Sequence, residues 1–71
     1  MFTLRDLIKN FYPYQHLSIC IMSGEKFDAI TEYIKETHPI YLDFYVRTIE
    51  IYRDDELGKL KDILKIIISK D

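Results

Sequence analysis

The chain has little of several residues that carry common chemistry. Its 71 residues include one cysteine, two glycines, two prolines and no tryptophan. The single cysteine, Cys20, excludes an internal disulfide, although small secreted domains commonly depend on several. The isolated glycines, Gly24 and Gly58, cannot form a phosphate-binding loop. We therefore expect a protein of a reducing cytoplasm that uses no cofactor.

Long apolar runs are also missing. The longest strongly apolar patch is Ile66, Ile67 and Ile68, whereas a membrane-spanning helix needs about 20 apolar residues. Near the start, charged residues interrupt the apolar ones, so no secretory signal is expected. Ten Lys and Arg residues against twelve Asp and Glu give a net charge of -2, the wrong sign for a dedicated nucleic-acid clamp. We expect a soluble, unprocessed protein without membrane contact or direct nucleic-acid binding.

Hydrophobic residues make up 48% of the chain and charged residues 31%, which is typical of a folded domain. Residues 1–71 are expected to form one small domain, because ordinary domains run to about 50–200 residues. A domain of this size buries only about 60% of the surface of its unfolded chain. A large catalytic cleft would compete with that small core, so the sequence does not favour an enzyme.

The first segment, TLRDLIKNF, predicts an amphipathic helix over residues 3–11. Thr3 is a good N-cap, and Asp6 three residues later resembles the second half of a capping box. Apolar residues then recur with helical spacing on one face, at Leu4, Leu7, Ile8 and Phe11. Pro13 is expected to end the helix.

The middle of the chain predicts a strand, a turn and a second helix. Residues 16–22, HLSICIM, alternate in the manner of a strand with one buried face. Ser23 and Gly24 mark a turn into a short strand or bend near residues 25–28. A helix is expected at about 29–37, and His38 and Pro39 give its stop signal.

The last third is rich in β-branched and aromatic residues. Residues 41–53 predict a long strand, with a bulge near Arg47 and Thr48 that corrects its imperfect alternation. Residues 55–68 fit either a helix or a strand over 63–68 that pairs with 44–52, and we favour the strand. The predicted fold is α+β, with an N-terminal helix packed on a small, mainly antiparallel sheet and a second helix near 29–37.

Residues suited to catalysis or metal binding are few. His16 and Cys20 would lie on the same face of a strand, but more than about 12 Å apart by rise alone. No Cys-x-x-Cys or His-x-x-x-His spacing accompanies them. A small metal-binding protein that uses His16, Cys20 or His38 is one alternative interpretation.

Tyrosine and a cluster of acidic residues are the features that favour binding. The chain has six tyrosines and four phenylalanines, and six phenols are more than a small core easily satisfies with hydrogen bonds. Tyrosine is favoured in protein interfaces, and the one acidic cluster follows Tyr52. We expect a partner-binding surface made of Asp54, Asp55, Glu56, Tyr52, Tyr14 and Tyr12.

Taken in order, TLRDLIKNF, YPYQ, HLSICIMSG, EKFDAITEYIKE and the terminal pair YVRTIEIY and ILKIII resemble a broad class of short proteins. These proteins are encoded by phages and mobile elements of low-GC Gram-positive bacteria. Some of them look like inhibitors of bacterial defence systems, including anti-CRISPR proteins. The resemblance implies stoichiometric binding to a large nuclease in the host-cell cytoplasm, and it carries over no site residues.

The expected function is therefore that of a non-enzymatic protein-binding module, and the resemblance implies a phage-encoded inhibitor. Its partner would be a nucleic-acid enzyme with a basic surface, which acidic side chains would attract and tyrosines would hold. A second alternative is a homodimeric structural or assembly protein, in which the last strand continues a sheet across a two-fold axis.

Overall fold

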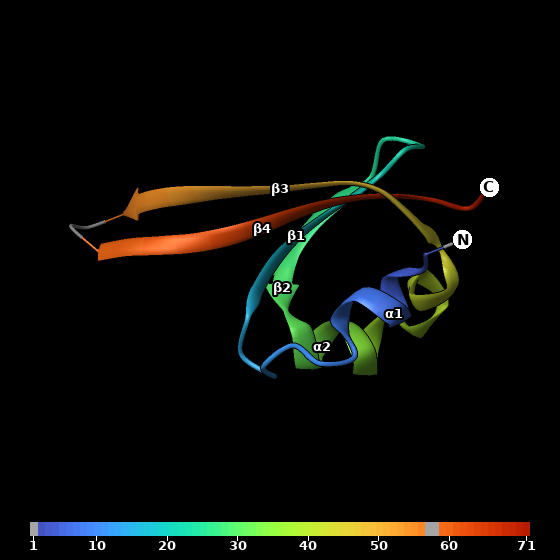
Figure 1. Cartoon of the computed structure of the whole chain (residues 1–71), viewed down its shortest axis with the longest axis horizontal. Coiled ribbons are helices and arrows are strands. Elements are labelled where there is room, and N and C mark those ends of the chain that lie inside the picture. Colours follow the sequence, from blue (N-terminus) through green and yellow to red (C-terminus); the bar gives the residue numbers. More distant parts are fainter. Residues whose placement is uncertain (1, 57–58) are drawn as a thin grey trace.

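The structure, a computed structural model, describes residues 2–56 and 59–71. Its fold is α+β, as the sequence predicts, and the last segment is a strand rather than the alternative helix (Figure 1). The elements in chain order are α1 (Leu4–Ile8), β1 (His16–Ile21), β2 (Lys26–Ile30), α2 (Thr31–Thr37), the 3-10 helix η1 (Pro39–Asp43), β3 (Tyr45–Glu56) and β4 (Lys59–Ser69).

The four strands form one mixed sheet in the order β2-β1-β4-β3. The β1–β2 and β3–β4 pairs are antiparallel, as expected, whereas β1 and β4 run parallel. The last strand therefore lies inside the sheet, where a run of consecutive apolar residues suits it. Over residues 64–68, β4 lies between β1 and β3, so at that stretch a sheet that continues into a second copy would have to extend from β2 or β3.

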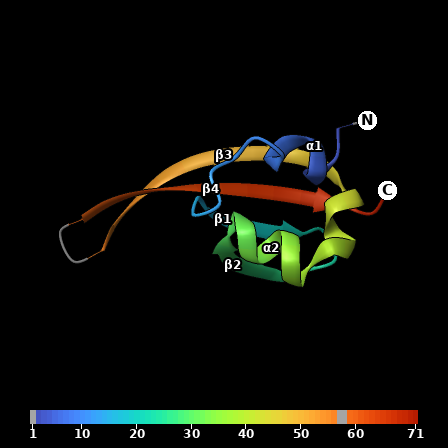
Figure 2. The same ribbon diagram turned by 90° about the horizontal axis from the view of Figure 1, so that it is seen from below.

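The helices lie together on one face of the sheet (Figures 1 and 2). Side chains from that face of β1 and β4 meet side chains from α1, α2 and η1 in a single core. The fully or nearly buried apolar members are Leu4, Ile8, Leu17, Ile19, Ile21, Ile34, Leu42, Ile66 and Ile68. The short helices are held by this burial, because isolated helices of their length are unstable in water.

Local signals fix where α1 begins. The Thr3 hydroxyl accepts a hydrogen bond from the Asp6 N–H at 3.2 Å, and the Asp6 carboxylate accepts one from the Thr3 N–H at 3.3 Å. This reciprocal pair is a capping box and confirms the predicted start of the helix. The helix ends at Ile8, three residues before the predicted end.

The predicted strand 41–53 is wrong at its beginning and confirmed from Tyr45 onward. Residues 39–43 form η1 instead, because Pro39 occupies the first turn, where its fixed φ is favourable. The second helix begins at Thr31, two residues later than predicted, because β2 continues to Ile30.

A bulge between Val46 and Thr48 resets the alternation of β3, at the position that the sequence indicates. Val46, Ile49 and Ile51 then lie opposite Ile68, Ile66 and Leu64 of β4. Directly paired residues share a face of the sheet, and Ile66 and Ile68 are buried under the helices. The three apolar residues of β3 therefore all face the helical side.

The β3–β4 hairpin extends beyond the rest of the sheet (Figure 1). Strand β1 pairs with β4 only over residues 64–68, although β4 begins at Lys59. Residues 52–56 and 59–63 thus form a two-stranded projection, which we call the arm. The projection contributes to the elongated shape of the molecule, 39 × 22 × 18 Å.

Candidate functional site: an apolar groove at the base of the arm

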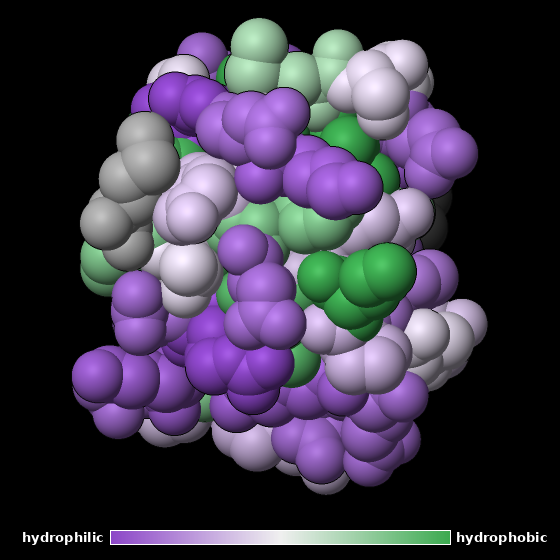
Figure 3. All heavy atoms as spheres, turned by 90° about the vertical axis from the view of Figure 1, so that its right-hand side faces the viewer, coloured by the Kyte–Doolittle hydropathy of each residue, from purple (hydrophilic) through white to green (hydrophobic). Residues whose placement is uncertain are grey.

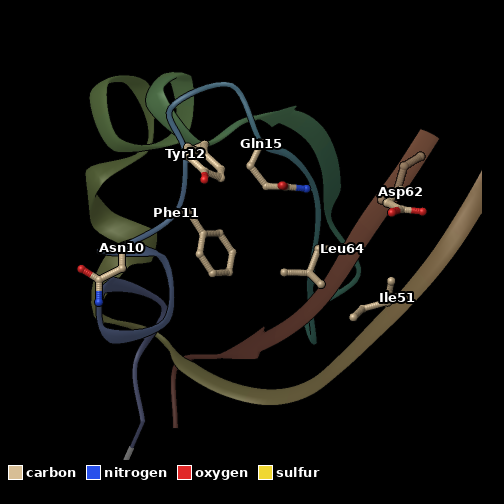
Figure 4. Close-up of a pocket in the computed structure, with 8 residues that line it drawn as sticks. Asn10, Phe11, Tyr12, Gln15, Ile51, Asp62 and Leu64 are labelled. Carbon is tan, nitrogen blue, oxygen red and sulfur yellow. The ribbon is translucent and has the colours of Figure 1, made fainter. Parts of the chain in front are cut away.

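A groove of about 380 Å³ lies where the arm leaves the helical layer. The segment after α1 forms one wall, and β3 and β4 form the other (Figure 4). Its lining residues are Asn10, Phe11, Tyr12, Gln15, Ile51, Asp62, Ile63 and Leu64. The groove is apolar at its centre, where Phe11 and Leu64 point toward it, and has polar groups at its rim (Figure 4).

The turn after α1 is fixed in place by backbone hydrogen bonds. The Gln15 N–H donates to the Tyr12 carbonyl at 3.0 Å, and the Glu32 N–H donates to the Pro13 carbonyl at 2.9 Å. The Gln15 carbonyl accepts from both the N–H and the hydroxyl of Thr31, a buried residue at the start of α2. This wall of the groove is therefore formed before any partner arrives.

The groove is bordered by large apolar side chains that remain in water. Two of the lining residues are strongly exposed, Tyr12 at 81% and Ile51 at 72%. Adjacent exposed apolar side chains of this size mark interaction surfaces more often than isolated ones do. Phe11 and Leu64, in contrast, pack against the core and anchor the groove to it.

Of the predicted binding residues, Tyr12 and Tyr14 are exposed, Tyr14 at 79%, and Tyr12 lines the groove. The side chains of the other four, Tyr52, Asp54, Asp55 and Glu56, lie outside the described part of the structure. Their backbone belongs to β3, opposite residues 63, 61, 60 and 59. This register puts the acidic residues far along the arm and pairs two of them with Lys59 and Lys61.

The groove residues that sequence reasoning missed come from separate parts of the chain. Ile51 belonged to the predicted strand, and Phe11 was expected only in the core. Asp62, which lies at the rim, forms an ion pair with Arg53 across the hairpin, with 3.2 Å between the carboxylate oxygen and Nε. No local signal could have found them, because only the tertiary fold brings these segments together.

The candidate metal ligands are not brought together. His16 and Cys20 lie opposite Ile30 and Lys26 of β2, on the face away from the helices. His38 is on the helical side, where its ring centroid lies 4.5 Å from that of Phe27. Among residues 2–56 and 59–71, no group of three or more histidine, cysteine or acidic side chains is placed to hold a metal ion.

A second cluster of aromatic residues surrounds His38. Its ring lies near Phe27, Tyr33 and Tyr41, and the Tyr41 hydroxyl donates to the Glu25 carboxylate at 3.2 Å. Burial, together with the Glu25 carboxylate, raises the pKa of Tyr41. This cluster ties η1 to the β1–β2 hairpin, so we assign it to stability.

Comparison of the chain with protein-family models, curated proteins and solved structures finds no match. No helix within the described ranges has the length and apolar character needed to cross a membrane.

The end of the molecule opposite the arm is covered mostly by hydrophilic side chains, with hydrophobic ones showing between them (Figure 3). The groove is therefore the best candidate for a functional site.

Proposed function

We propose that this protein is a non-enzymatic binding module that attaches stoichiometrically to another protein through the groove at the base of the arm. The observation that supports the proposal is the position of Tyr12. It is 81% exposed beside an apolar hollow whose walls are already in place. Covering large apolar side chains of this kind commonly provides most of the binding energy of an interface.

The chemistry of the groove describes the partner. An apolar side chain of the partner would fill the space between Phe11 and Leu64, and Asn10 and Gln15 at the rim would bind its polar flanks. The acidic residues 54–56, further along β3, are the feature of the sequence that favours a partner with a basic surface, with Asp54 and Glu56 opposite Lys61 and Lys59. Enzymes that act on nucleic acids have such surfaces. The resemblance to short phage proteins makes a nuclease of a bacterial defence system the first partner to test.

The test compares two tyrosines of the same turn. Tyr12→Asp places a charge in the groove, whereas Tyr14→Asp changes an equally exposed tyrosine that does not line it. Tagged protein and both variants are used to capture partners from bacterial lysate, and the captured protein is then purified and titrated by calorimetry. We expect Tyr12→Asp to weaken binding at least about tenfold, or 1.4 kcal/mol, and Tyr14→Asp to weaken it much less.

Both variants should unfold at the denaturant concentration of the wild type, because neither tyrosine is buried. Equal affinity of the Tyr12→Asp and Tyr14→Asp variants for the purified partner would remove the groove from the binding site. The proposed function would be contradicted if the wild type captured no protein, or if no captured protein bound it again after purification.

A further inference from the structure

The outer edge of β3 is long and open. Near its start, Thr3 forms a bridge with Tyr45, and the Val46 N–H donates to the Phe2 carbonyl at 2.8 Å. Beyond Val46, no strand in the described ranges pairs with this side of β3. An open edge of this length offers a row of backbone donors and acceptors to another strand.

The Val46 hydrogen bond shows which residues direct their backbone groups outward. In a strand, residues whose side chains share a face also direct their N–H and C=O groups to the same side. Val46 donates away from β4, and Ile49, Ile51 and Arg53 follow it on the same face. Strand β4 agrees with this phase, because the Ile68 carbonyl accepts from the Met22 N–H on the side of β1.

We propose that a second copy of this chain occupies the edge, with the two β3 strands antiparallel about a two-fold axis at Ile51. The hydrogen bonds would join Ile51 to Ile51 of the second copy, and Ile49 to Arg53 in both directions. The result is a continuous eight-stranded sheet. This inference concerns the strand edge and goes beyond the proposed function of the groove.

The sequence of β3 selects this register over its neighbours. An axis at Glu50 would set Glu50 against itself. An axis at Tyr52 would set Glu50 against Asp54, and an axis at Arg53 would set that residue against itself. Like charges directly opposite each other destabilise a pair of strands.

An axis at Ile49 fails for a steric reason. Because the bulge leaves Val46 only two paired positions from Ile49, this axis would bring Ile51 of the second copy opposite Val46, whose edge already bonds to Phe2. With the axis at Ile51, Thr48 lies opposite Asp54, and no like charges meet between residues 48 and 54. The register at Ile51 is therefore both self-complementary and accessible.

Pairing at Ile51 would also cover the exposed apolar residues of β3. Ile51, 72% exposed, would contact its own counterpart on the helical side of the sheet. Ile49, 43% exposed, would receive the aliphatic part of Arg53, a side chain that can bury its methylene groups and keep its charge in water.

Cysteine cross-linking of the full chain tests the register. In a Cys20→Ser background, Ile51→Cys would place two thiols on residues whose Cα atoms are about 5.5 Å apart, within the range of a disulfide. Ile49→Cys would hold its two thiols about 13 Å apart, so it should not cross-link to itself. A mixture of the Ile49→Cys and Arg53→Cys proteins should cross-link.

Ile40→Cys is the matched control, because Ile40 is 71% exposed and lies in η1, away from the edge. Under mild oxidation we expect disulfide dimers from Ile51→Cys and from the mixture, and monomers from Ile49→Cys alone and Ile40→Cys. Cross-linking of Ile49→Cys as fast as Ile51→Cys would overturn the register.

Sedimentation of chains without added cysteines gives a second measurement. The wild type and Ile40→Lys should sediment as dimers at high micromolar concentration, and Ile51→Lys should lose the dimer without losing its fold. The proposal would be overturned if the wild type were a monomer at that concentration and Ile51→Cys formed disulfide dimers no faster than Ile40→Cys. That outcome would leave the Tyr12 test of the groove unaffected.

Discussion

The two edge strands of this sheet differ in how they are protected. Strand β2 has five residues, exposes the charged Lys26 and Asp28, and leads directly into α2. Strand β3 has twelve residues and exposes Ile49 and Ile51. Short length and charge are the usual means by which proteins prevent pairing at a sheet edge. Strand β2 uses both, whereas β3 keeps apolar side chains at the centre of its open edge.

Covered and uncovered regions also differ on the face of the sheet that the helices pack against. Ile66 and Ile51 both face the helical side, but Ile66 is completely buried and Ile51 is 72% exposed. The helical layer thus covers the β1 side and stops before the arm. In a domain of 71 residues with a small core, leaving such apolar surface uncovered points to a partner rather than to stability.

The largest expected effect comes from removing a side chain under the helical layer. Ile66→Ala should lower the free energy of unfolding by about 2–5 kcal/mol, because a buried isoleucine leaves a cavity. Ile51→Ala should change it by less than about 0.5 kcal/mol in the monomer, because the side chain is already in water. Urea unfolding at low protein concentration measures both. Equal losses would show that Ile51 contributes to the core.

Amide hydrogen exchange compares neighbouring residues within β3. The N–H groups of Ile49 and Ile51 point outward, and the N–H of Glu50 points toward β4. At low protein concentration, we expect the outward amides to exchange at least about tenfold faster than Glu50, a difference of about 1.4 kcal/mol in protection. At high concentration the outward amides should slow, because the second copy covers them. Rates that do not depend on concentration would contradict pairing at this edge.

Local signals in the sequence predicted much of the fold. Thr3 and Asp6 fixed the start of α1, and the parity break at Arg47 located the bulge. The parallel pairing of β1 with β4 was not predictable in this way, because it joins Leu17 to Leu64 across most of the chain. The groove was missed for the same reason. Its walls come from residues 10–15, 51 and 62–64, which only the tertiary fold brings together.

The capping box tests how the helical layer is held over its half of the sheet. Thr3→Ala should cost about 1 kcal/mol of unfolding free energy, because α1 loses its N-cap. The effect should be the same at any protein concentration, unlike effects at the β3 edge. A loss that grows with protein concentration would mean that the N-terminal segment also takes part in pairing.

The pH dependence of this cap follows from Asp6. Hydrogen bonding to the backbone and side chain of Thr3 lowers the pKa of Asp6 in the folded protein. A lowered pKa in the folded state stabilises the protein above the unfolded-state pKa, and this contribution is lost as pH falls through the folded-state pKa. Asp6→Asn should therefore be less stable than the wild type at neutral pH, and the difference should shrink in acid. Urea unfolding at neutral and acidic pH measures it, and a constant difference would exclude this cause.

The smallest effects are expected from two matched ion pairs, one in each half of the molecule. Arg5 and Asp43 join α1 to η1 at 3.2 Å, and Arg53 and Asp62 join the strands of the hairpin at 3.2 Å. All four side chains are more than half exposed, so each pair is worth about 0.5 kcal/mol or less. Asp43→Asn and Asp62→Asn should lower the unfolding free energy of the monomer by similarly small amounts.

These two substitutions test whether charge or apolar burial makes the helical layer more stable than the β3–β4 hairpin. Suppose that Asp43→Asn lowered the unfolding free energy by several kcal/mol while Asp62→Asn left it unchanged. In that case the helical layer would be held by electrostatics as well as by its apolar core. Equal, small losses would show that the two halves differ mainly in apolar burial. Apolar burial is large between the helical layer and β1, and Ile51 gains it only when a second chain pairs with β3.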